Sequence, residues 1–549
     1  MKINTLSYYF VAILLFVLVP VSNGWAAVIE RSGTISAHTT WSNEDVQLIT
    51  GNVTVSSGII LTIEAGAVVK FNSGRSLTVQ GALDAQGTAI DKIHFTSYRD
   101  DSLGGDTNGD GNSQAEKGDW GYLYFTSTVT TTLTKLNYLD VRYGGSNNVG
   151  NVYIYRTNIA INNSEISHGS SYGVRSYDAS PSITNSQIND NNSSGIYLRG
   201  TGSPLIQGNG ITANTHGVYI YDNTTPTIDN NQITDNTGWG IYYRSSPSAP
   251  VITHNTITGN LQNATLPASA VPSSSDNNVL APNEINGLWI RGGNRLEDLH
   301  LALLFSGEAH ELNTYQIEGT LTVGSGTTMT VDPGVVVKFN TNSRLDINGT
   351  LIADGSEALP IAFTSYRDDT QGGDFNSDGY DSSPANGDWG RITFTSQAVD
   401  DASVLDYVTV QYGGSDQGNI YSYKTNLTIT NSQIANSKGY GIYSRDANLT
   451  LTNNEIFSNG DDGIYYYGTN TSHITGGRIF ANFGNGLRAQ HSTAVTINDV
   501  EIFANVGQGI RSSSSAAIEA TGNWWGAVDG ASGDEAGSGD QVLSTGSGG

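Results

Sequence analysis

Tyrosine and arginine recur in this sequence at a regular step of about 22 residues, mostly two or four positions after a glycine. Alternate residues of a β-strand point to the same side, so stacked strands would place these side chains in two columns on one outer face. A tyrosine ring offers an apolar face and a polar hydroxyl, which suits sugar rings, and an arginine offers a rigid fork for carboxylates. We therefore expect a glycan-binding face formed by Tyr153, Tyr155, Arg175, Tyr177, Tyr197, Arg199, Tyr219, Tyr221, Tyr242 and Arg244 in the first half, and by Tyr421, Tyr423, Tyr443, Arg445, Tyr465, Tyr467, Arg488 and Arg511 in the second.

The same columns have a second interpretation, as a ladder that only stabilises the sheet. Arginine also stacks on aromatic rings, and exposed cation–π contacts contribute about 0.5–1 kcal/mol each. The two interpretations predict different results when tyrosines are removed, because only glycan binding makes retention on a polysaccharide depend on these rings.

Two short acidic segments have the spacing of calcium-binding loops. They are Asp106, Asn108 and Asp110 before Gly111, and Asp374, Asn376 and Asp378 before Gly379. Oxygen ligands at positions 1, 3 and 5 followed by glycine at position 6 form the first half of an EF-hand loop. The glutamate of position 12 is missing, since Lys117 and Ala385 stand there. We expect a shorter structural Ca²⁺ site in each half, with further ligands among Asp100, Asp101, Asp368 and Asp369. The alternatives are a solvated acidic turn and a catalytic Ca²⁺ that bridges a uronate.

One pair of acidic residues is the sequence's candidate for a catalytic site. Asp461 and Asp462 form an acidic pair at a turn beside the expected glycan-binding face, and two carboxyl groups can act as general acid and base. The simpler alternative is a polar turn in an acidic protein. The sequence has no His-Glu-x-x-His motif and no Gly-x-Ser-x-Gly motif in a strand–turn–helix context. The missing motifs favour a non-catalytic protein; the enzymatic alternative is a polysaccharide lyase or a glycoside hydrolase.

Isoleucines with the same step indicate the elements that must position these residues. One column is Ile166, Ile188, Ile211, Ile233 and Ile257, and short alternating runs between its members are punctuated by Asn and Gly. One such unit cannot bury its apolar face alone, so the units must stack. Three strands and three turns per unit, rising about 4.8 Å per coil, make a parallel β-helix. A β-propeller, with blades of about 40 residues, does not produce this column.

An asparagine column follows three positions after the isoleucines. Stacked asparagine side chains at one turn can hydrogen-bond up and down the helix and satisfy the amides of the turn. We expect a structural ladder formed by Asn191, Asn214, Asn236, Asn260, Asn459, Asn482 and Asn505.

The chain contains an internal duplication. Phe95–Asp101 recurs as Phe363–Asp369, and Gly118–Gly121 recurs as Gly387–Gly390 at nearly the same offset along the chain. We expect two tandem homologous β-helix copies over 27–265 and 310–526. A signal peptide over 1–26, a connecting segment over 266–309 and a flexible tail rich in Gly, Ser and Asp over 527–549 complete the expected organisation.

Composition limits the partners and the compartment. The 51 acidic and 25 basic residues give a net charge of −26, which argues against nucleic acid as the main partner. The absence of cysteine excludes disulfides and thiol catalysis. Lys2, the apolar run Tyr9–Val21 and small residues near Ala26 are typical of a secretory signal peptide, and no later apolar run has the length of a membrane span. We expect a secreted, extracellular or cell-surface protein, or a periplasmic one, whose partner is a polysaccharide or cell-surface glycan.

The opening segments of the two copies, Leu61–Phe71 and Met329–Phe339, and the closing Gly522–Gly526 resemble modules of secreted bacterial β-helix proteins. Together with the columns, they make nearly all of 30–530 similar to the right-handed parallel β-helix repeat proteins of the pectate-lyase-like superfamily, including its carbohydrate-binding and sugar-hydrolase repeat domains. The resemblance implies an all-β, right-handed parallel β-helix with saccharides along a strand face. The galacturonan-hydrolase and pectate-lyase motifs are absent, so it implies no specific activity. We expect a polysaccharide-binding protein with a structural or adhesive role; the alternative is a polysaccharide lyase or related enzyme that uses the same face.

Overall fold

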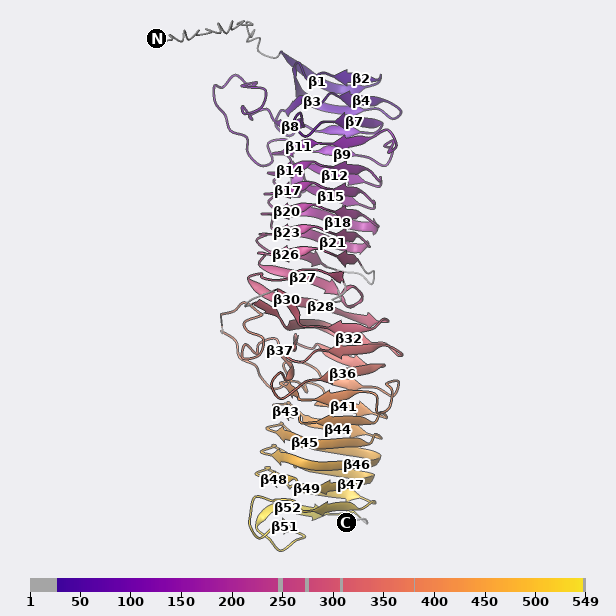
Figure 1. The fold of residues 1–549 in the computed structure, drawn as a ribbon, viewed down its shortest axis with the longest axis vertical. Coiled ribbons are helices and arrows are strands. Elements are labelled where there is room, and N and C mark those ends of the chain that lie inside the picture. The colour runs from indigo at the N-terminus through magenta and orange to yellow at the C-terminus, as the bar shows by residue number, and fades with distance from the viewer. Residues whose placement is uncertain (1–26, 245–249, 272–275, 307–309, 380, 547–549) are drawn as a thin grey trace, which may run out of the picture.

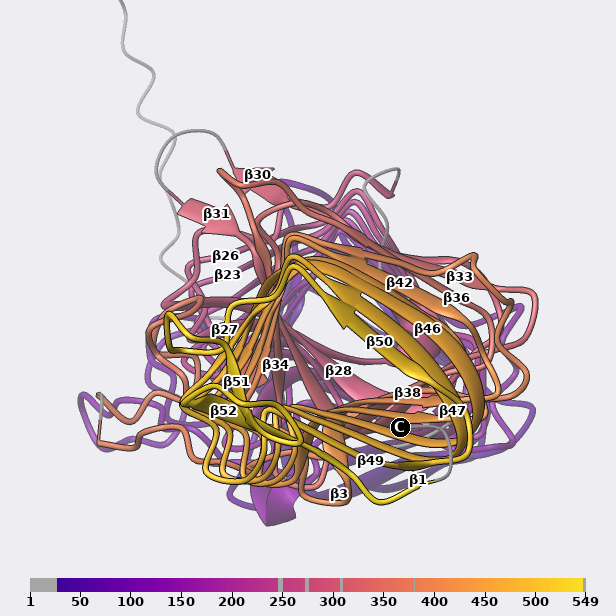
Figure 2. The same cartoon turned by 90° about the horizontal axis from the view of Figure 1, so that it is seen from below.

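The protein folds into a rod of stacked coils with its two ends far apart (Figure 1). The computed structural model describes residues 27–244, 250–271, 276–306, 310–379 and 381–546. Strands pair in parallel with the strands one coil above and below, and about 20 coils form a β-solenoid. Figure 2 looks along the rod and shows the coils superimposed. The predicted parallel β-helix is confirmed and the propeller is excluded; the predicted signal peptide lies outside the described residues.

In the first half of the rod the coils contribute strands to three faces, here named A, B and C. Face A contains β5 (Val68–Phe71), β8 (Ile93–Ser97), β11 (Leu139–Arg142), β14 (Glu165–Ser167), β17 (Gln187–Asn189), β20 (Gly210–Thr212), β23 (Gln232–Thr234) and β26 (Thr256–Thr258). Face B contains β2 (Thr39–Trp41), β4 (Ile60–Ile63), β7 (Ala82–Gln86), β10 (Lys135–Asn137), β13 (Ala160–Asn162), β16 (Ser182–Thr184), β19 (Leu205–Gln207), β22 (Thr227–Asp229) and β25 (Val251–Thr253). Face C contains β6 (Leu77–Val79), β9 (Leu123–Phe125), β12 (Val152–Tyr155), β15 (Val174–Tyr177), β18 (Ser194–Gly202), β21 (His216–Thr224), β24 (Trp239–Tyr243) and β27 (Gln262–Pro267). The strands β1 (Val28–Ile35) and β3 (Val46–Val55) span faces A and C, and the short 3₁₀ segments are η1 (Ser146–Asn148) and η2 (Ala268–Ala270).

The second half repeats this order, with faces named A2, B2 and C2. Face A2 contains β34 (Val336–Phe339), β37 (Ile361–Ser365), β40 (Val408–Gln411), β43 (Gln433–Ala435) and β48 (Glu501–Phe503). Face B2 contains β29 (Leu299–Leu301), β33 (Thr328–Val331), β36 (Thr350–Asp354), β39 (Val404–Asp406), β42 (Leu427–Thr430) and β50 (Ile518–Thr521). Face C2 contains β35 (Arg344–Ile347), β38 (Ile392–Phe394), β41 (Gly418–Tyr423), β44 (Tyr440–Arg445), β49 (Ile510–Ser514) and β52 (Gly539–Ser544). Long strands that span two or more faces are β28 (Ile285–Arg295), β32 (Thr314–Val323), β45 (Leu449–Phe457), β46 (Ile464–Phe480) and β47 (Leu487–Asn498), and the remaining strands are β30 (Leu304–Ser306), β31 (His310–Leu312) and β51 (Ala531–Gly533).

Aliphatic columns fill the interior of the rod. Every isoleucine of the predicted column, from Ile166 to Ile257, is at most 1% exposed. Larger rings fill the coils near the start of each half: Trp120 stacks on Phe71 with ring centroids 4.2 Å apart, and Trp389 stacks on Phe339 at 4.1 Å. Because alternate strand residues point inward, the residues between them are left on the outer faces, where the predicted site residues lie.

The predicted asparagine ladder is confirmed. The buried side-chain amides donate to the Oδ1 of the asparagine one coil further on, for example Asn191 Nδ2 to Asn214 at 2.9 Å and Asn459 Nδ2 to Asn482 at 2.9 Å. The last one, Asn505 Nδ2, donates to Asp540 Oδ2 at 2.9 Å. Asn191 Nδ2 also donates to a backbone carbonyl oxygen of its own turn, that of Asn189 at 3.0 Å. A second buried ladder, which the sequence reasoning missed, runs through Asn209, Asn231 and Asn255.

The segment 266–309, expected to connect two copies, contributes coils to the rod. β27 pairs with β28, and β28 pairs with β32, in a parallel ladder. The first part of β32 pairs with both β28 and β34, so hydrogen bonding continues face C into face A2. Face C2 begins on the second part of β28, at Asn294. The two halves therefore form one solenoid in which the faces shift by one position at the junction.

The segment after Trp525 adds strands where its composition predicts a flexible tail. β51 pairs with β52, and β52 extends face C2 by pairing with β49, with Val542 opposite Ile510. Ala531 is buried and Val542 packs against the core, so a few apolar residues suffice to dock the segment on the last coil. Within the part of the chain that the structure describes, no helix has the length and apolar character needed to cross a membrane.

Candidate functional site

The predicted tyrosines and arginines of the first half stack in two columns on face C. The first column, from β12 to β24, contains the successive register partners Tyr153, Arg175, Tyr197, Tyr219 and Tyr242. The second contains Tyr155, Tyr177, Arg199 and Tyr221. The rings of Tyr197 and Tyr219 lie 5.2 Å apart, and both side chains are half-buried on the outside of the rod. These two columns, with the exposed Arg244 beside them, are called the first stripe.

The glycine two positions before most first-column residues, such as Gly195 before Tyr197, is required by close packing between coils. A Cβ on Gly195 would lie 2.8 Å from Ile211 Cγ2 and 2.9 Å from Asn214 Nδ2 of the next coil. The corner of each coil therefore rests on the isoleucine and asparagine ladders of the next. This contact fixes the height of the stripe residues relative to one another.

Arginines in the first stripe are sandwiched between tyrosines. The Arg175 guanidinium lies 5.1 Å from the Tyr153 ring centroid and 6.0 Å from that of Tyr197. The Arg199 guanidinium lies 5.7 Å from the Tyr177 centroid and 5.2 Å from the Tyr221 centroid. These contacts support the ladder interpretation, and they also hold the rings in fixed positions, as a binding surface for sugars requires.

Several aromatic residues next to the first stripe were missed by the sequence reasoning. Tyr124 stacks on Tyr153 at 5.0 Å, Tyr172 on Tyr197 at 4.5 Å, and His216 on Tyr242 at 5.4 Å. At the far end, Trp239 and Trp289 meet edge to face at 5.2 Å. Trp289 could have been found, because Gly287-Leu288-Trp289 repeats the Gly-apolar-aromatic pattern of the earlier coils.

The centre of the first stripe is hollowed. A depression of about 350 Å³ is lined by Tyr172, Ser193, Tyr197, Arg199, Thr215, His216, Tyr219, Tyr221 and Arg244. Burial raises the pKa of Tyr197 and Tyr219 and lowers the pKa of His216, so all three are neutral at pH 7. His216 Nδ1 accepts a hydrogen bond from the Trp239 amide at 3.1 Å, which also requires this nitrogen to be unprotonated. The charge in the depression therefore comes from its two arginines.

Some stripe arginines have no acidic partner. Arg199 Nε lies 3.4 Å from Asp222 Oδ2, but among the described residues no carboxylate lies within 4 Å of Arg175, Arg244 or Arg445. The Arg244 Nη1 donates instead to the Tyr219 hydroxyl at 3.4 Å. In a chain with a net charge of −26, each of these guanidinium groups is a local positive charge on its stripe that can bind an anionic group.

The predicted residues of the second half form a second stripe on face C2. Its first column is Tyr421, Tyr443, Tyr465, Arg488 and Arg511, and its second contains Tyr423, Arg445 and Tyr467. Tyr421, Tyr443 and Tyr465 stack at 5.0 Å intervals. Arg445 lies between Tyr423 at 5.5 Å and Tyr467 at 5.7 Å, and Arg391, which was not predicted, lies 5.1 Å from Tyr421. Tyr465 is only 9% exposed, so it supports the surface more than it forms it.

The two predicted catalytic candidates differ in their surroundings. Asp462 is fully buried; its Oδ1 accepts hydrogen bonds from the Asn485 backbone and side-chain amides, and its Oδ2 lies 3.9 Å from Arg488 Nη1. Burial raises the pKa of Asp462, and it raises the pKa of nearby Tyr440 to about 12. Asp461 lies at the partly exposed turn, where its Oδ1 accepts the Asp462 amide. The pair is thus divided between a buried group and a surface group.

The acidic loops gather their carboxylates as their spacing predicts. Carboxylate oxygens of Asp101, Asp106 and Asp110 lie within 4.8 Å of one another, as do those of Asp369, Asp374 and Asp378. Asp100 and Asp368 are outside these clusters, because each is buried and hydrogen-bonded to a threonine, Thr96 at 2.5 Å and Thr364 at 2.6 Å. The predicted Asn108 and Asn376 turn their amide nitrogens toward Asp110 and Asp378.

Several oxygens of these clusters fit a cation. Asp101 Oδ1, Asn376 Oδ1 and both carboxylate oxygens of Asp369 are shielded from solvent and accept no hydrogen bond within the described structure. Burial raises the pKa of Asp369. Carboxylate and amide oxygens are the ligands that Ca²⁺ prefers, and a bound ion would satisfy these buried oxygens.

A fully buried lysine lies beneath each acidic loop. Lys70 Nζ donates to the Gly105 carbonyl at 2.6 Å, and Lys338 Nζ donates to the Gly373 carbonyl at 2.6 Å. Burial lowers the pKa of Lys338 to about 8, and the nearby carboxylate of Asp369 acts in the opposite direction. Each loop is therefore tied to the sheet by an ammonium group next to its acidic cluster.

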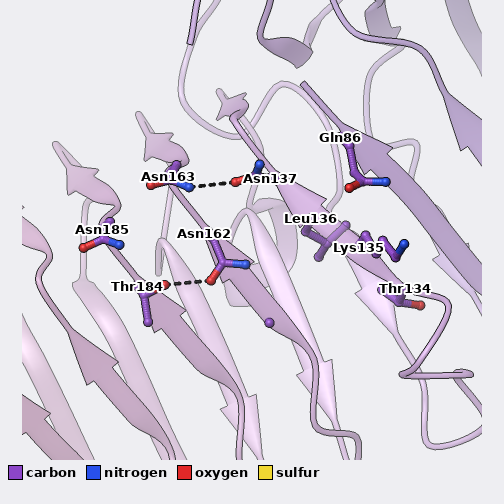
Figure 3. Close-up of a pocket in the computed structure, with 10 residues that line it drawn as sticks. Gln86, Thr134, Lys135, Leu136, Asn137, Asn162, Asn163, Thr184 and Asn185 are labelled. Carbon is purple, nitrogen blue, oxygen red and sulfur yellow. Dashed lines mark hydrogen bonds between the residues drawn. The ribbon is translucent and has the colours of Figure 1, made fainter. Parts of the chain in front are cut away.

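Another hollow lies on face B, away from both stripes (Figure 3). It measures about 400 Å³ and is lined mainly by Gln86, Lys135, Asn137, Asn162, Asn163 and Asn185. Asn163 Nδ2 donates to Asn137 Oδ1 at 2.8 Å, and the Thr184 hydroxyl donates to Asn162 Oδ1 at 2.7 Å. These side chains largely satisfy one another between coils, and the lining contains no acid or base pair, so we assign no chemistry to this hollow.

Comparison with known proteins agrees with this architecture. The family model described as the right-handed β-helix region matches residues 123–297 and 398–546, which together make up more than half of the chain. No curated protein matches the sequence. The parallel coils, the ladders along them and the extent of this match lead to one conclusion, that the chain belongs to the right-handed β-helix family.

Proposed function

We propose that this protein binds polysaccharide along its two stripes and acts as a structural or adhesive rod, secreted or held at the cell surface. The observation that carries the proposal is the depression on the first stripe, in which four tyrosine rings and two arginines converge. A ring column spaced by the rise of the coils offers repeated stacking surfaces to a repeating polymer. The polymer most consistent with this surface is acidic, because the unpaired guanidinium groups can bind carboxylates.

Retention on immobilised polysaccharides tests this function. The purified protein is passed over polygalacturonate, alginate and neutral dextran columns of equal loading. We expect delay on the acidic polymers, weakening as salt screens the arginines, and passage through dextran. Passage through all three columns would contradict the proposal.

The alternative function is a polysaccharide lyase or a related glycan-processing enzyme on the same face. One feature favours it: the pKa of Asp462 is raised, and Asp462 lies near Tyr440 and beside Arg488 of the second stripe. Against it, Asp462 is fully buried and has no direct access to a sugar. Incubation with polygalacturonate or alginate distinguishes the two functions, since a rise in ultraviolet absorbance from unsaturated products would assign a lyase.

We also propose that each acidic loop holds a structural Ca²⁺ ion. The clustered carboxylates and the buried oxygens without hydrogen-bond donors support this, since an ion would satisfy them. In that arrangement Asp101, Asp106 and Asp110 hold one ion, and Asp369, Asp374 and Asp378 hold the other, with Asn108 and Asn376 able to supply amide oxygens. The ion would offset the mutual repulsion of the carboxylates and rigidify the loop.

Calorimetric titration of the EDTA-treated protein with CaCl₂ is expected to show two sites per chain, with dissociation constants of about 10⁻⁴–10⁻³ M, as in extracellular modules. Asp374→Asn is expected to remove one site and Asp106→Asn the other, because each takes one negative ligand from a different cluster. Asp91→Asn, at an exposed aspartate outside both clusters, is the matched control. An absence of heat at millimolar CaCl₂ would reject the sites.

A further inference from the structure

The first stripe ends at a definite point of the rod. Its first column continues from Tyr242 through Thr265 to Trp289, and the next register partners are Gln316 and Lys338. Gln316 and Lys338 are 1% and 0% exposed. The sheet that carries the first stripe therefore continues without an exposed stripe beyond Trp289.

A loop from the second half covers this end. Phe375, between Asp374 and Asn376 of the acidic loop, is 1% exposed and stacks near Trp289 with ring centroids 6.1 Å apart. Gly287 makes room for it, since a Cβ at that position would lie 1.4 Å from Phe375 Cε2. Lys338 holds the same loop through the Gly373 carbonyl.

The matching loop of the first half makes different contacts. Thr107 occupies the position that corresponds to Phe375; its hydroxyl accepts the Lys70 ammonium and donates to the Tyr98 carbonyl. The closure is thus specific to the junction.

The second stripe belongs to a different hydrogen-bonded column. Followed back from Tyr421, the column contains Thr393, Asp346, Thr322 and Asn294. None of these four residues has a ring, and Asp346 is paired with Arg344 at 3.0 Å. Four coil steps of about 4.8 Å separate the coil of Trp289 from that of Tyr421, an axial gap of about 19 Å.

From this break we propose that the rod carries two independent polysaccharide sites, one on each stripe, with the loop around Phe375 closing the end of the first. This inference rests on the proposed function. A short oligosaccharide then occupies each site separately, so two bind per chain. A polymer long enough to reach both sites binds more tightly than a short oligosaccharide, because binding at one site raises the effective concentration of sugar at the other. The second site can bind the same polymer molecule or a neighbouring one.

The test is calorimetric titration with tetragalacturonate, which is about as long as the gap and therefore cannot cross it and fill both sites at once. The intact protein is expected to bind two molecules per chain. Tyr197→Ala with Tyr219→Ala, and separately Tyr421→Ala with Tyr443→Ala, are each expected to leave one. Retention on polygalacturonate is expected to weaken at least tenfold in either double variant, because linkage between the sites is lost. If a double variant does not fold, Arg199→Gln and Arg445→Gln remove a cation from one stripe each and leave every ring in place.

The number of tetragalacturonate molecules bound by each variant shows whether the rod has two sites, one site or none. One molecule per chain, lost with either pair of substitutions, would mean a single continuous site and overturn the inference. One molecule lost with only one pair would make the other stripe a stacking ladder, which also overturns it. An absence of tetragalacturonate binding together with passage through the polygalacturonate column contradicts the proposed function itself.

Discussion

Replacing Tyr197 and Tyr219 together by alanine is expected to abolish retention on acidic polysaccharide by the first stripe. Both rings line the central depression and stack on one another. Truncating an aromatic anchor of a binding surface costs about 2 kcal/mol or more, so two losses correspond to roughly a thousandfold weaker binding. Measured with the second stripe disabled by Tyr421→Ala and Tyr443→Ala, retention on a polygalacturonate column should disappear.

The same double substitution should leave the rod folded. Each lost aromatic contact is worth about 0.5–1.5 kcal/mol, and four are affected, those of Tyr197 and Tyr219 with each other and with Tyr172, Tyr242 and His216. The stacking of Arg175 on Tyr197 is lost as well. The melting temperature should fall by only a few degrees. Tyr98→Ala with Tyr366→Ala is the matched control, because these half-buried rings also contact arginines, at 5.5 and 5.2 Å, but lie outside both stripes. Unchanged retention of the stripe variant would make the columns a stabilising ladder only.

Replacing Asn191 by alanine is expected to have the largest effect on stability, about 2–4 kcal/mol, because each buried group left without a partner costs about 1–3 kcal/mol. Asn191 Oδ1 accepts the Gly169 amide at 2.9 Å, and its Nδ2 donates to Asn214 at 2.9 Å and to the Asn189 carbonyl at 3.0 Å. The alanine variant leaves the buried Gly169 amide without this acceptor and takes one donor from Asn214 Oδ1, which keeps the Asn191 backbone amide at 3.1 Å. Denaturant unfolding followed by circular dichroism measures the loss.

Asn192→Ala is the matched control for the asparagine ladder. Asn192 is the next residue of the same turn, but it is exposed, and from the described residues its side chain accepts only the Lys117 ammonium, at 3.0 Å. Its replacement should change stability by less than about 0.5 kcal/mol. Because coils of a solenoid interact mainly with their neighbours, hydrogen exchange in Asn191→Ala should rise around β17 and β20 and stay unchanged around β45. Equal losses in the two variants would show that the ladder contributes no special stability.

The coil length and the ladders could be predicted because they are periodic. Ile188, Asn191 and Tyr197 each recur once per coil along the sequence, and each has one environment, respectively core, turn and outer face. A periodic position repeats the same contacts in every coil, so local pattern and tertiary structure agree there. The acidic clusters were predicted in part, since spacing alone could not decide between Asp100 and Asp101, one of which is buried on Thr96.

The amino-acid sequence by itself determined the stacked parallel coils, the residues inside and outside them, and the tyrosine–arginine columns, because each depends on a repeat that can be read along the chain. Only the tertiary structure decided that the faces shift at β28 and that Phe375 closes the first stripe on Trp289. It also decided that the segments 266–309 and 527–546 add strands to the rod. These features arise where the period is interrupted, and there the outcome depends on packing between residues that are far apart in the sequence.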